Sequence, residues 1–247
     1  MSDTHDGTTT PATDAEELPR LTPALLRDAE TMCPLRARHE YRGTRGNRGG
    51  NGRYRVRQSI VSQARVAHAE MRAAESRHFE ALPNLLPEEV QRFDTAAAAY
   101  VDLFADSPGR TIELDEWETI DEERGVRLVG GVDLLLEVPG GGAEIRSLDV
   151  DPWTTPGGPT EDAGVRFALF RVTDEVSGGP VRIRSANLRD GVIDYDVTVD
   201  LDDERDAIGE WLDERLRVVR AIDSDGEPRP SMECGRCKFV SRCGAHK

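Results

Sequence analysis

The feature that most constrains this fold is the placement of its cysteines. The chain has four of them. One stands at position 33, and the other three form a C-x2-C-x5-C cluster close to the C-terminus. Thiolates at such short spacing can reach one centre, and a distant fourth ligand would tie both ends of the chain to it. We therefore predict a four-cysteine metal site made by Cys33, Cys234, Cys237 and Cys243.

The identity of the metal follows from the spacing of the ligands. Four sulfur ligands suit either zinc or an iron–sulfur cluster. Zinc sites more often pair two C-x2-C motifs, whereas a lone ligand about 200 residues away from the other three favours a cubane cluster. Disulfides are disfavoured in a reducing compartment, and four unrelated thiols are disfavoured by their clustering. We expect a 4Fe-4S cluster, with zinc as the alternative.

The charge balance limits the possible chemistry. The net charge is −15, and Lys238 and Lys247 are the only lysines among 32 basic residues. An acidic, lysine-poor surface is typical of a halophilic protein working in high salt, although a GC-rich genome also favours arginine. Net charge therefore does not exclude nucleic acid as a ligand. Neither lysine lies in a P-loop, which argues against an ATPase.

Composition and patterning predict one domain in the cytoplasm. The chain has 247 residues, of which 37% are hydrophobic and 32% charged. No run approaches the ~18 apolar residues of a membrane span. The polar start lacks the basic and apolar regions of a secretory signal, so we expect a disordered tail over residues 1–18 and a single domain over 19–247.

The order of predicted elements indicates an α/β fold with a central mixed sheet flanked by helices. A helical part spans residues 19–105 with a basic loop at 42–56, a sheet part spans 106–200, and a final helix with the cysteine cluster spans 201–247. Periodicity and turn residues predict helices over 21–32, 36–41, 57–77, 87–104, 162–176 and 202–222, and strands over 110–118, 126–138, 143–150, 181–188 and 192–199.

A basic segment precedes the predicted sheet. Between positions 33 and 68 the chain has nine arginines and one acidic residue, Glu40. With its glycines and tyrosines, the segment is typical of a phosphate-binding arm for single-stranded nucleic acid. The alternative is a basic linker that neutralises the acidic bulk of the protein. The predicted nucleic-acid-binding residues are Arg42, Arg45, Arg48, Arg53, Tyr54, Arg55 and Arg57.

Four stretches together resemble a known family. The segment 21–41, with Cys33-Pro34 after a helix, resembles the opening of RecB-like nucleases of the PD-(D/E)XK superfamily. Residues 126–137 are similar to the strand of that superfamily that ends in its first acid, and 63–68 are similar to an upstream motif that ends in histidine. The cysteine frame resembles the iron–sulfur staple of AddB-type helicase–nucleases and CRISPR-associated exonucleases. The resemblance implies a restriction-endonuclease-like fold.

The resemblance also implies a metal-dependent hydrolase. Phosphodiester cleavage needs Mg²⁺ or Mn²⁺ held by carboxylates, an activated water and positive charge near the reacting phosphate. His68 and Asp133 fill the first two family positions, and with Asp149 they are the predicted metal ligands. The third position is either Glu144 with Arg146 or Ser147-x-Asp149, because a one-residue change of strand register exchanges the two faces.

The family lysine is absent, so the catalytic motif is degenerate. Arginine can stabilise phosphate charge but does not act as a base near neutral pH. The leading hypothesis is a RecB-like exonuclease-type protein that acts on single-stranded DNA or DNA ends in DNA repair or a CRISPR-type complex, with catalysis weakened or lost. The alternative is a non-catalytic iron–sulfur module that binds DNA or a protein partner, and a zinc-stapled structural protein is a third.

Overall fold

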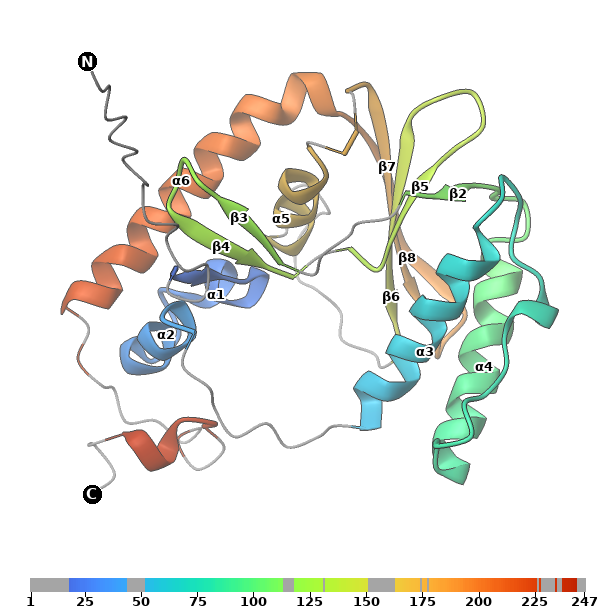
Figure 1. Cartoon of the computed structure of the whole chain (residues 1–247), viewed down its shortest axis with the longest axis horizontal. Helices are drawn as coiled ribbons and strands as arrows, with labels where there is room; N and C mark the ends of the chain where they lie inside the picture. The colour runs from blue at the N-terminus through green and yellow to red at the C-terminus, as the bar shows by residue number, and fades with distance from the viewer. Residues whose placement is uncertain are drawn as a thin grey trace, which may run out of the picture.

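A computed structural model describes most of the chain (Figure 1). The described residues are 18–43, 52–112, 118–130, 132–150, 163–173, 175–176, 178–225, 227, 234 and 237–243, without the side chains of 52–54, 225 and 242. Residues 1–17 of the predicted tail therefore lie outside the described part. No helix in that part is long and apolar enough to cross a membrane.

The larger sheet has five strands in the order β2-β5-β6-β7-β8. Neighbouring strands are antiparallel except β6 and β7, which are parallel and are joined through helix α5. The sheet is therefore mixed, as the sequence predicts. Its strands are β2 (Arg110–Thr111), β5 (Leu134–Glu137), β6 (Ala143–Asp149), β7 (Pro180–Asn187) and β8 (Val192–Asp200).

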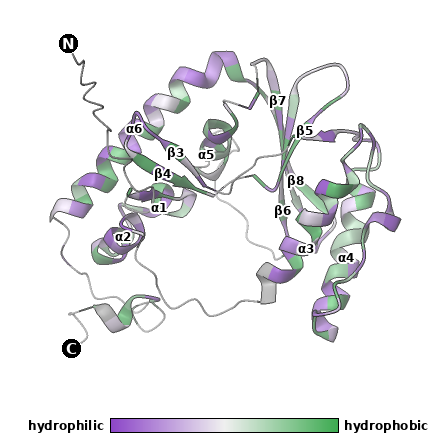
Figure 2. Cartoon of the chain, viewed as in Figure 1, coloured by the Kyte–Doolittle hydropathy of each residue, from purple (hydrophilic) through white to green (hydrophobic). Residues whose placement is uncertain are grey.

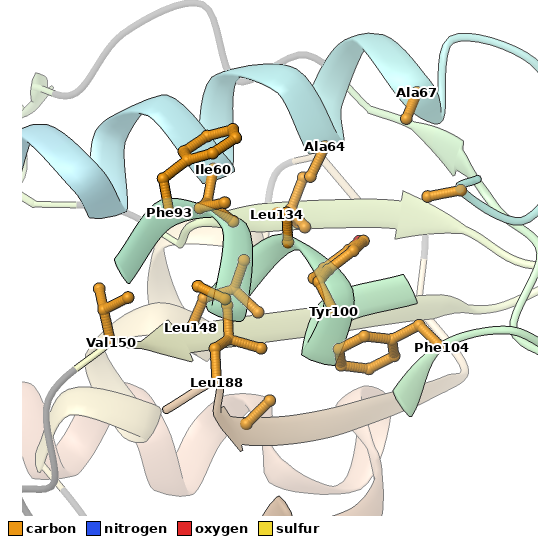
Figure 3. Packing of buried hydrophobic residues seen from close by; sticks show 14 of the residues in the cluster. Ile60, Ala64, Ala67, Phe93, Tyr100, Phe104, Leu134, Leu148, Val150 and Leu188 are labelled. Atoms are coloured by element: carbon orange, nitrogen blue, oxygen red, sulfur yellow. The ribbon is translucent and has the colours of Figure 1, made fainter. Parts of the chain in front are cut away.

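Helices cover both faces of this sheet. On one face lie α3 (Gly52–Ala67) and α4 (Pro87–Leu103), whose apolar side chains pack on Leu134, Leu148 and Leu188 (Figure 3). On the other face, α5 (Ala163–Val172) and α6 (Leu201–Asp225) pack on alternate residues of the same strands. The two-residue period of the strands thus gives each helical layer its own apolar surface.

A smaller sheet in the order β1-β4-β3 lies beside α1, α2 and α6 (Figure 1). Its strands are β1 (Arg20–Leu21), β4 (Val126–Val129) and β3 (Glu118–Asp121). The flanking helices are α1 (Pro23–Asp28) and α2 (Pro34–Tyr41), and two short 3-10 helices are η2 (Ser76–His78) and η4 (Val240–Arg242). Figure 2 shows that α2 and α6 carry long hydrophilic stretches, consistent with helices that are buried along one side only.

Several predicted elements are shorter than the sequence indicates, among them the helices predicted over 21–32 and 162–176, which are observed as α1 (Pro23–Asp28) and α5 (Ala163–Val172). The predicted strand 126–138 divides into β4 and β5, which belong to different sheets. Gly130, with a φ of 123°, follows the end of β4, and this backbone conformation is strained for other residues. The predicted helix 57–77 ends at Ala67, and η2 follows after a short connection.

The register of β5 and β6 determines which acidic and basic residues meet. Leu134 is paired with Arg146, and Leu136 with Glu144. Side chains of paired residues lie on the same face of a sheet, so Glu144 and Arg146 share the α3–α4 face with Leu134. Asp133 precedes the first residue of β5 and lies at the edge of this pairing.

Candidate functional site

Asp133 is buried at the start of β5, with 5% of its surface exposed. Its Oδ2 accepts hydrogen bonds from the Leu148 backbone N–H (2.7 Å) and from Nη2 of Arg57 on α3 (2.8 Å). Nε of Arg57 also donates to the Leu148 carbonyl oxygen at 2.8 Å. Burial raises the pKa of the Asp133 carboxyl, and the Arg57 guanidinium and the Leu148 N–H oppose that rise. Arg57 thus joins α3 to both strands of the hairpin.

Glu144 and Arg146 form a second ion pair deeper in the molecule. Arg146 Nε lies 2.5 Å from Glu144 Oε1, and the two side chains are 0% and 2% exposed, respectively. Arg184 of β7 places its Nη1 3.6 Å from the same oxygen. The carboxylate of Glu144 is therefore neutralised by two arginines from adjacent strands.

His68 and Tyr100 complete this buried network. His68 Nδ1 lies 2.9 Å from the Arg72 carbonyl oxygen, so Nδ1 carries the proton and Nε2 is the acceptor. Nε2 lies 2.9 Å from the Tyr100 hydroxyl and 3.1 Å from Arg146 Nη1. Burial, together with the Arg146 charge, lowers the pKa of His68, and burial raises the pKa of Tyr100. The histidine is thereby held neutral.

Aromatic rings and the chain after α4 seal the network. The guanidinium carbon of Arg146 lies 4.1 Å from the centre of the Phe104 ring, and that of Arg184 lies 4.8 Å from the same ring. Ser107 accepts a hydrogen bond from Arg146 through its carbonyl oxygen (2.9 Å) and from Arg184 through its hydroxyl (2.8 Å). These contacts hold both guanidinium groups against protein, although Nε of Arg184 is buried without a hydrogen-bond partner among the described residues.

The structure gathers some of the predicted catalytic residues and separates others. His68, Glu144 and Arg146 lie together, whereas the hydrogen bonds of the Asp133 carboxylate come from Arg57 of α3 and from the Leu148 backbone of β6. Asp149 ends β6 in register with Asn187, and its charge helps to raise the pKa of Asp194. Among the described residues, no three His, Cys, Asp or Glu side chains are close enough to share one metal ion. The predicted ligand set of His68, Asp133 and Asp149 is therefore not assembled.

The cysteines lie in two separate segments, one at the start of α2 and the other near the C-terminus. Cys33 is the residue before α2, and Cys234, Cys237 and Cys243 lie in consecutive turns. All four thiols are half-buried. Within the described part of the chain they do not form a group that could hold a metal. The donor chemistry fits an iron–sulfur cluster, but the four sulfur atoms do not converge, and the staple remains a prediction.

The C-terminal cysteine segment nevertheless packs against α2. Phe239, which is 2% exposed, stacks on His39 with ring centres 4.9 Å apart. Lys238 Nζ lies 3.2 Å from Glu40 Oε1. Both partners belong to the helix that begins after Cys33, so the two ends of the described chain are in contact there.

Three arginines of the predicted DNA-binding arm form ion pairs within the protein. Arg42 pairs with Asp223 at 2.7 Å, Arg55 with Glu89 at 2.9 Å, and Arg57 with Asp133 at 2.8 Å. Their side chains remain 58%, 45% and 36% exposed. Arg45 and Arg48 lie outside the described residues, as do the side chains of Arg53 and Tyr54, whose backbones begin α3.

Several residues of the network were missed in the sequence. Tyr100 directly follows a run of four alanines on α4, and Arg184 alternates with apolar residues on β7. A polar aromatic residue within a small-residue helix is a weak indication of a buried hydroxyl that needs a partner. Arg65, which donates to the Asp133 carbonyl oxygen at 3.0 Å, was counted in the basic segment but not assigned to the site.

Comparison with known proteins adds no family to this description. No family model matches the chain, and no curated protein matches it significantly.

Proposed function

We propose that this chain is a non-catalytic, single-stranded-DNA-binding module built on a nuclease-type core, with a 4Fe-4S cluster at Cys33, Cys234, Cys237 and Cys243. The proposal retains the resemblance to RecB-like nucleases and adopts the binding function rather than the cleavage function. The observation that carries it is the pairing of two of the three candidate acids with arginine: Asp133 with Arg57, and Glu144 with Arg146.

This pairing bears on catalysis through charge. A cation-dependent nuclease uses its carboxylates to hold Mg²⁺ or Mn²⁺ beside the reacting phosphate. Here, guanidinium groups supply the positive charge that neutralises Asp133 and Glu144. Arginine also binds phosphate through paired N–H donors, so the partly exposed Arg57 beside Asp133 favours phosphate binding over hydrolysis.

The DNA-binding part of the proposal rests on the exposed arginines of the arm. Arg42, Arg55 and Arg57 each pair with a carboxylate but keep a third or more of the side chain exposed. A guanidinium has five N–H donors, so an ion pair with one carboxylate leaves donors for a phosphate. In high salt the electrostatic part of such binding is screened, and stacking by aromatic side chains gains weight.

The cluster part rests on the donor set and on the contact between the cysteine segment and α2. When bound, a 4Fe-4S cluster would link four thiolates, and its formation would stabilise the fold because metal binding and folding are coupled. Anaerobically purified protein should contain iron and sulfide and show the visible absorbance of a cluster, and Cys33→Ser should lose both. Zinc in place of iron, with unchanged stability of Cys33→Ser, would contradict this part.

The decisive test of function compares binding and cleavage in the same preparation. Cluster-intact protein is incubated with labelled single-stranded DNA and Mn²⁺, and the parent is compared with Asp133→Ala. We expect both proteins to bind the strand and neither to cleave it. Robust Mn²⁺-dependent cleavage that Asp133→Ala abolishes would overturn the non-catalytic proposal and favour the exonuclease. Absence of DNA binding by the folded parent would overturn the DNA-binding function.

A further inference from the structure

The outer face of the small sheet carries two adjacent arginines. Arg20 of β1 is paired in parallel register with Arg127 of β4. Their neighbours Leu21, Val126 and Leu128 are buried in the core beneath. Because side chains alternate along a strand, Arg20 and Arg127 lie on the side of the sheet opposite that core.

This arrangement concentrates positive charge in one place. Like charges directly opposite each other on a sheet are destabilising without a counter-charge. Arg127 has one, since its Nε lies 2.7 Å from Glu118 Oε1. The Nε atoms of Arg20 and Arg127 are both buried without a hydrogen-bond partner within the described part of the chain, and the Arg127 side chain is 15% exposed. The two arginines therefore carry two positive charges against the one negative charge of Glu118.

The basic arm begins on top of this pair. Gly43 has a φ of 65°, and a Cβ at this position would lie 2.8 Å from Arg20 Cδ and 3.4 Å from Arg127 Nη2. The residue before it, Arg42, shares the carboxylate of Asp223 with Arg38. Only a residue without a side chain fits so closely above the two arginines. The sequence then continues into the arm, with further arginines at positions 45 and 48.

We infer that Arg20 and Arg127 form a phosphodiester-binding face at which a single strand enters the basic arm. The inference rests on the DNA-binding function proposed above and adds a site outside both the arm and the nuclease-type core. Planar guanidinium groups bind phosphate oxygens in pairs, which suits two adjacent arginines with one counter-charge between them. Ile120, paired with Arg127 and 42% exposed, adds an apolar surface for a sugar or base.

The test measures the salt dependence of binding to labelled oligothymidylate and to labelled oligouridylate. For a single strand the slope of log K against log salt is negative, and each lost phosphate contact reduces its magnitude by about 0.7. Arg20→Gln/Arg127→Gln should therefore lower the slope by ~1.4. The matched control is Arg77→Gln/Arg110→Gln, which removes two exposed, ion-paired arginines elsewhere and should leave the slope unchanged. The two oligonucleotides distinguish DNA from RNA as the source of the phosphodiester.

A second variant separates a loss of binding from a loss of folding. Arg20→Gln alone removes no ion pair between described residues and should melt like the parent, while lowering the slope by about 0.7. An unchanged slope in both variants, with the parent binding DNA, would overturn this inference and leave the proposed function in place. A parent that binds neither strand overturns both. If an oligoglutamate peptide binds equally well and loses the same affinity in Arg20→Gln, the face binds acidic protein and the inference is also wrong.

Discussion

The two carboxylate–arginine pairs on the β5–β6 hairpin differ in what surrounds them. Glu144 and Arg146 are 2% and 0% exposed beneath Tyr100 and Phe104. Asp133 is equally buried, but its partner Arg57 remains 36% exposed. The first pair is closed on every side by protein groups, whereas the second opens to solvent through the arginine. A ligand can therefore compete for Arg57 but not for Arg146, which indicates that the inner pair has a structural role.

The two pairs should therefore lose different amounts of stability when the arginine is removed. Taking two charges out of water is costly, and a buried pair recovers that cost only through close mutual contact and additional hydrogen bonds. Arg146 meets this condition with Glu144, Tyr100 and Ser107. Arg57 meets it in part, because solvent can replace some of its contacts.

The largest effect should come from Arg146→Met. The substitution leaves Glu144 buried, with Arg184 at 3.6 Å as its remaining ion-pair partner among the described residues, and should destabilise the fold by about 3 kcal/mol. Urea unfolding measures the loss. Replacing both residues with apolar ones, in Glu144→Leu/Arg146→Met, should recover most of it, because the uncompensated charge is gone. A double variant as unstable as Arg146→Met would show that the hydrogen bonds to Tyr100 and Ser107 matter more than the charge pair.

Arg57→Met should have a smaller effect. It leaves Asp133 with the Leu148 N–H, a loss of about 1–2 kcal/mol for a buried acceptor that loses one partner. Because burial raises the pKa of Asp133, the linked stability is fully present below the unfolded pKa and is lost as the pH rises through the folded pKa. Without Arg57 that pKa rises further. Urea unfolding should therefore show a larger defect at neutral pH than at acidic pH.

The control for Arg57 is Asp133→Asn/Arg57→Met. This double variant has no carboxylate to protonate at that position, so its deficit should not depend on pH in the same way. Equal pH dependence in the single and double variants would show that Asp133 is not the titrating group. It would also remove the contrast between the open and the sealed pair.

Much of the fold could be predicted because local signals and burial agree. Thr22 caps α1 before Pro23, and its hydroxyl accepts from the Leu25 N–H at 3.1 Å. The hairpin β7–β8 and helix α4 also lie where turn residues and apolar periodicity place them. Each of these elements carries its information within a few residues. The split between β4 and β5 was not predicted, because glycine inside a strand indicates a bend or a bulge but not that the chain moves to another sheet at Gly130.

The candidate site could be predicted only in its residue types. The sequence identified Glu144 with Arg146 as one of two alternatives, and the register with Leu134 and Leu136 places them on the α3–α4 face. Their partners come from distant segments: Tyr100 from α4, and Arg184 from β7. Long-range pairing of this kind depends on the complete packing, so the neutralisation of both acids by arginine was not visible in the sequence. The described part of the structure does not gather the cysteines into a metal-binding group, so the cluster remains a prediction.

A pH-dependent effect should separate the sealed network from the rest of the molecule. His68 faces Arg146, Tyr100 and Glu144, and its pKa is lowered by burial and by the Arg146 charge. The unfolded chain therefore binds a proton at His68 more readily than the folded chain does. The free energy of unfolding should fall as the pH drops through and below the pKa that His68 has in the unfolded chain. Between about pH 7.5 and pH 5 we expect His68→Gln to lose less stability than the parent does, by ~1 kcal/mol.

The measurement is a series of urea unfolding curves over that pH range. His78→Gln is a suitable control, because His78 lies on the short helix η2 and is not buried. That variant should follow the parent at every pH. If His68→Gln follows the parent as well, the proton is taken up elsewhere on acidification and the network is not sealed against it.

The smallest effect on stability should come from the substitution of Arg42, an exposed arginine paired with Asp223. Arg42 pairs with Asp223 through Nε (2.7 Å) and Nη2 (3.2 Å), but its side chain is 58% exposed. Exposed pairs contribute little, so Arg42→Gln should cost ~0.5 kcal/mol or less. If the arm binds a phosphate strand, the same variant should lower the slope of log K against log salt for single-stranded DNA by about 0.7.

Arg182→Gln is the matched control for Arg42. Arg182 makes the same kind of two-bond pair with Asp196, is 45% exposed, and lies on β7 away from the arm. It should cost a similar, small amount of stability and leave DNA binding unchanged. Equal slopes for the two variants would mean that Arg42 only pairs with Asp223 and does not bind DNA, just as Arg146 only makes contacts within the buried network. A slope that falls for Arg42→Gln alone would show that an ion pair at the surface of this acidic protein holds an arginine in place for a strand, whereas an ion pair beneath Phe104 holds the fold.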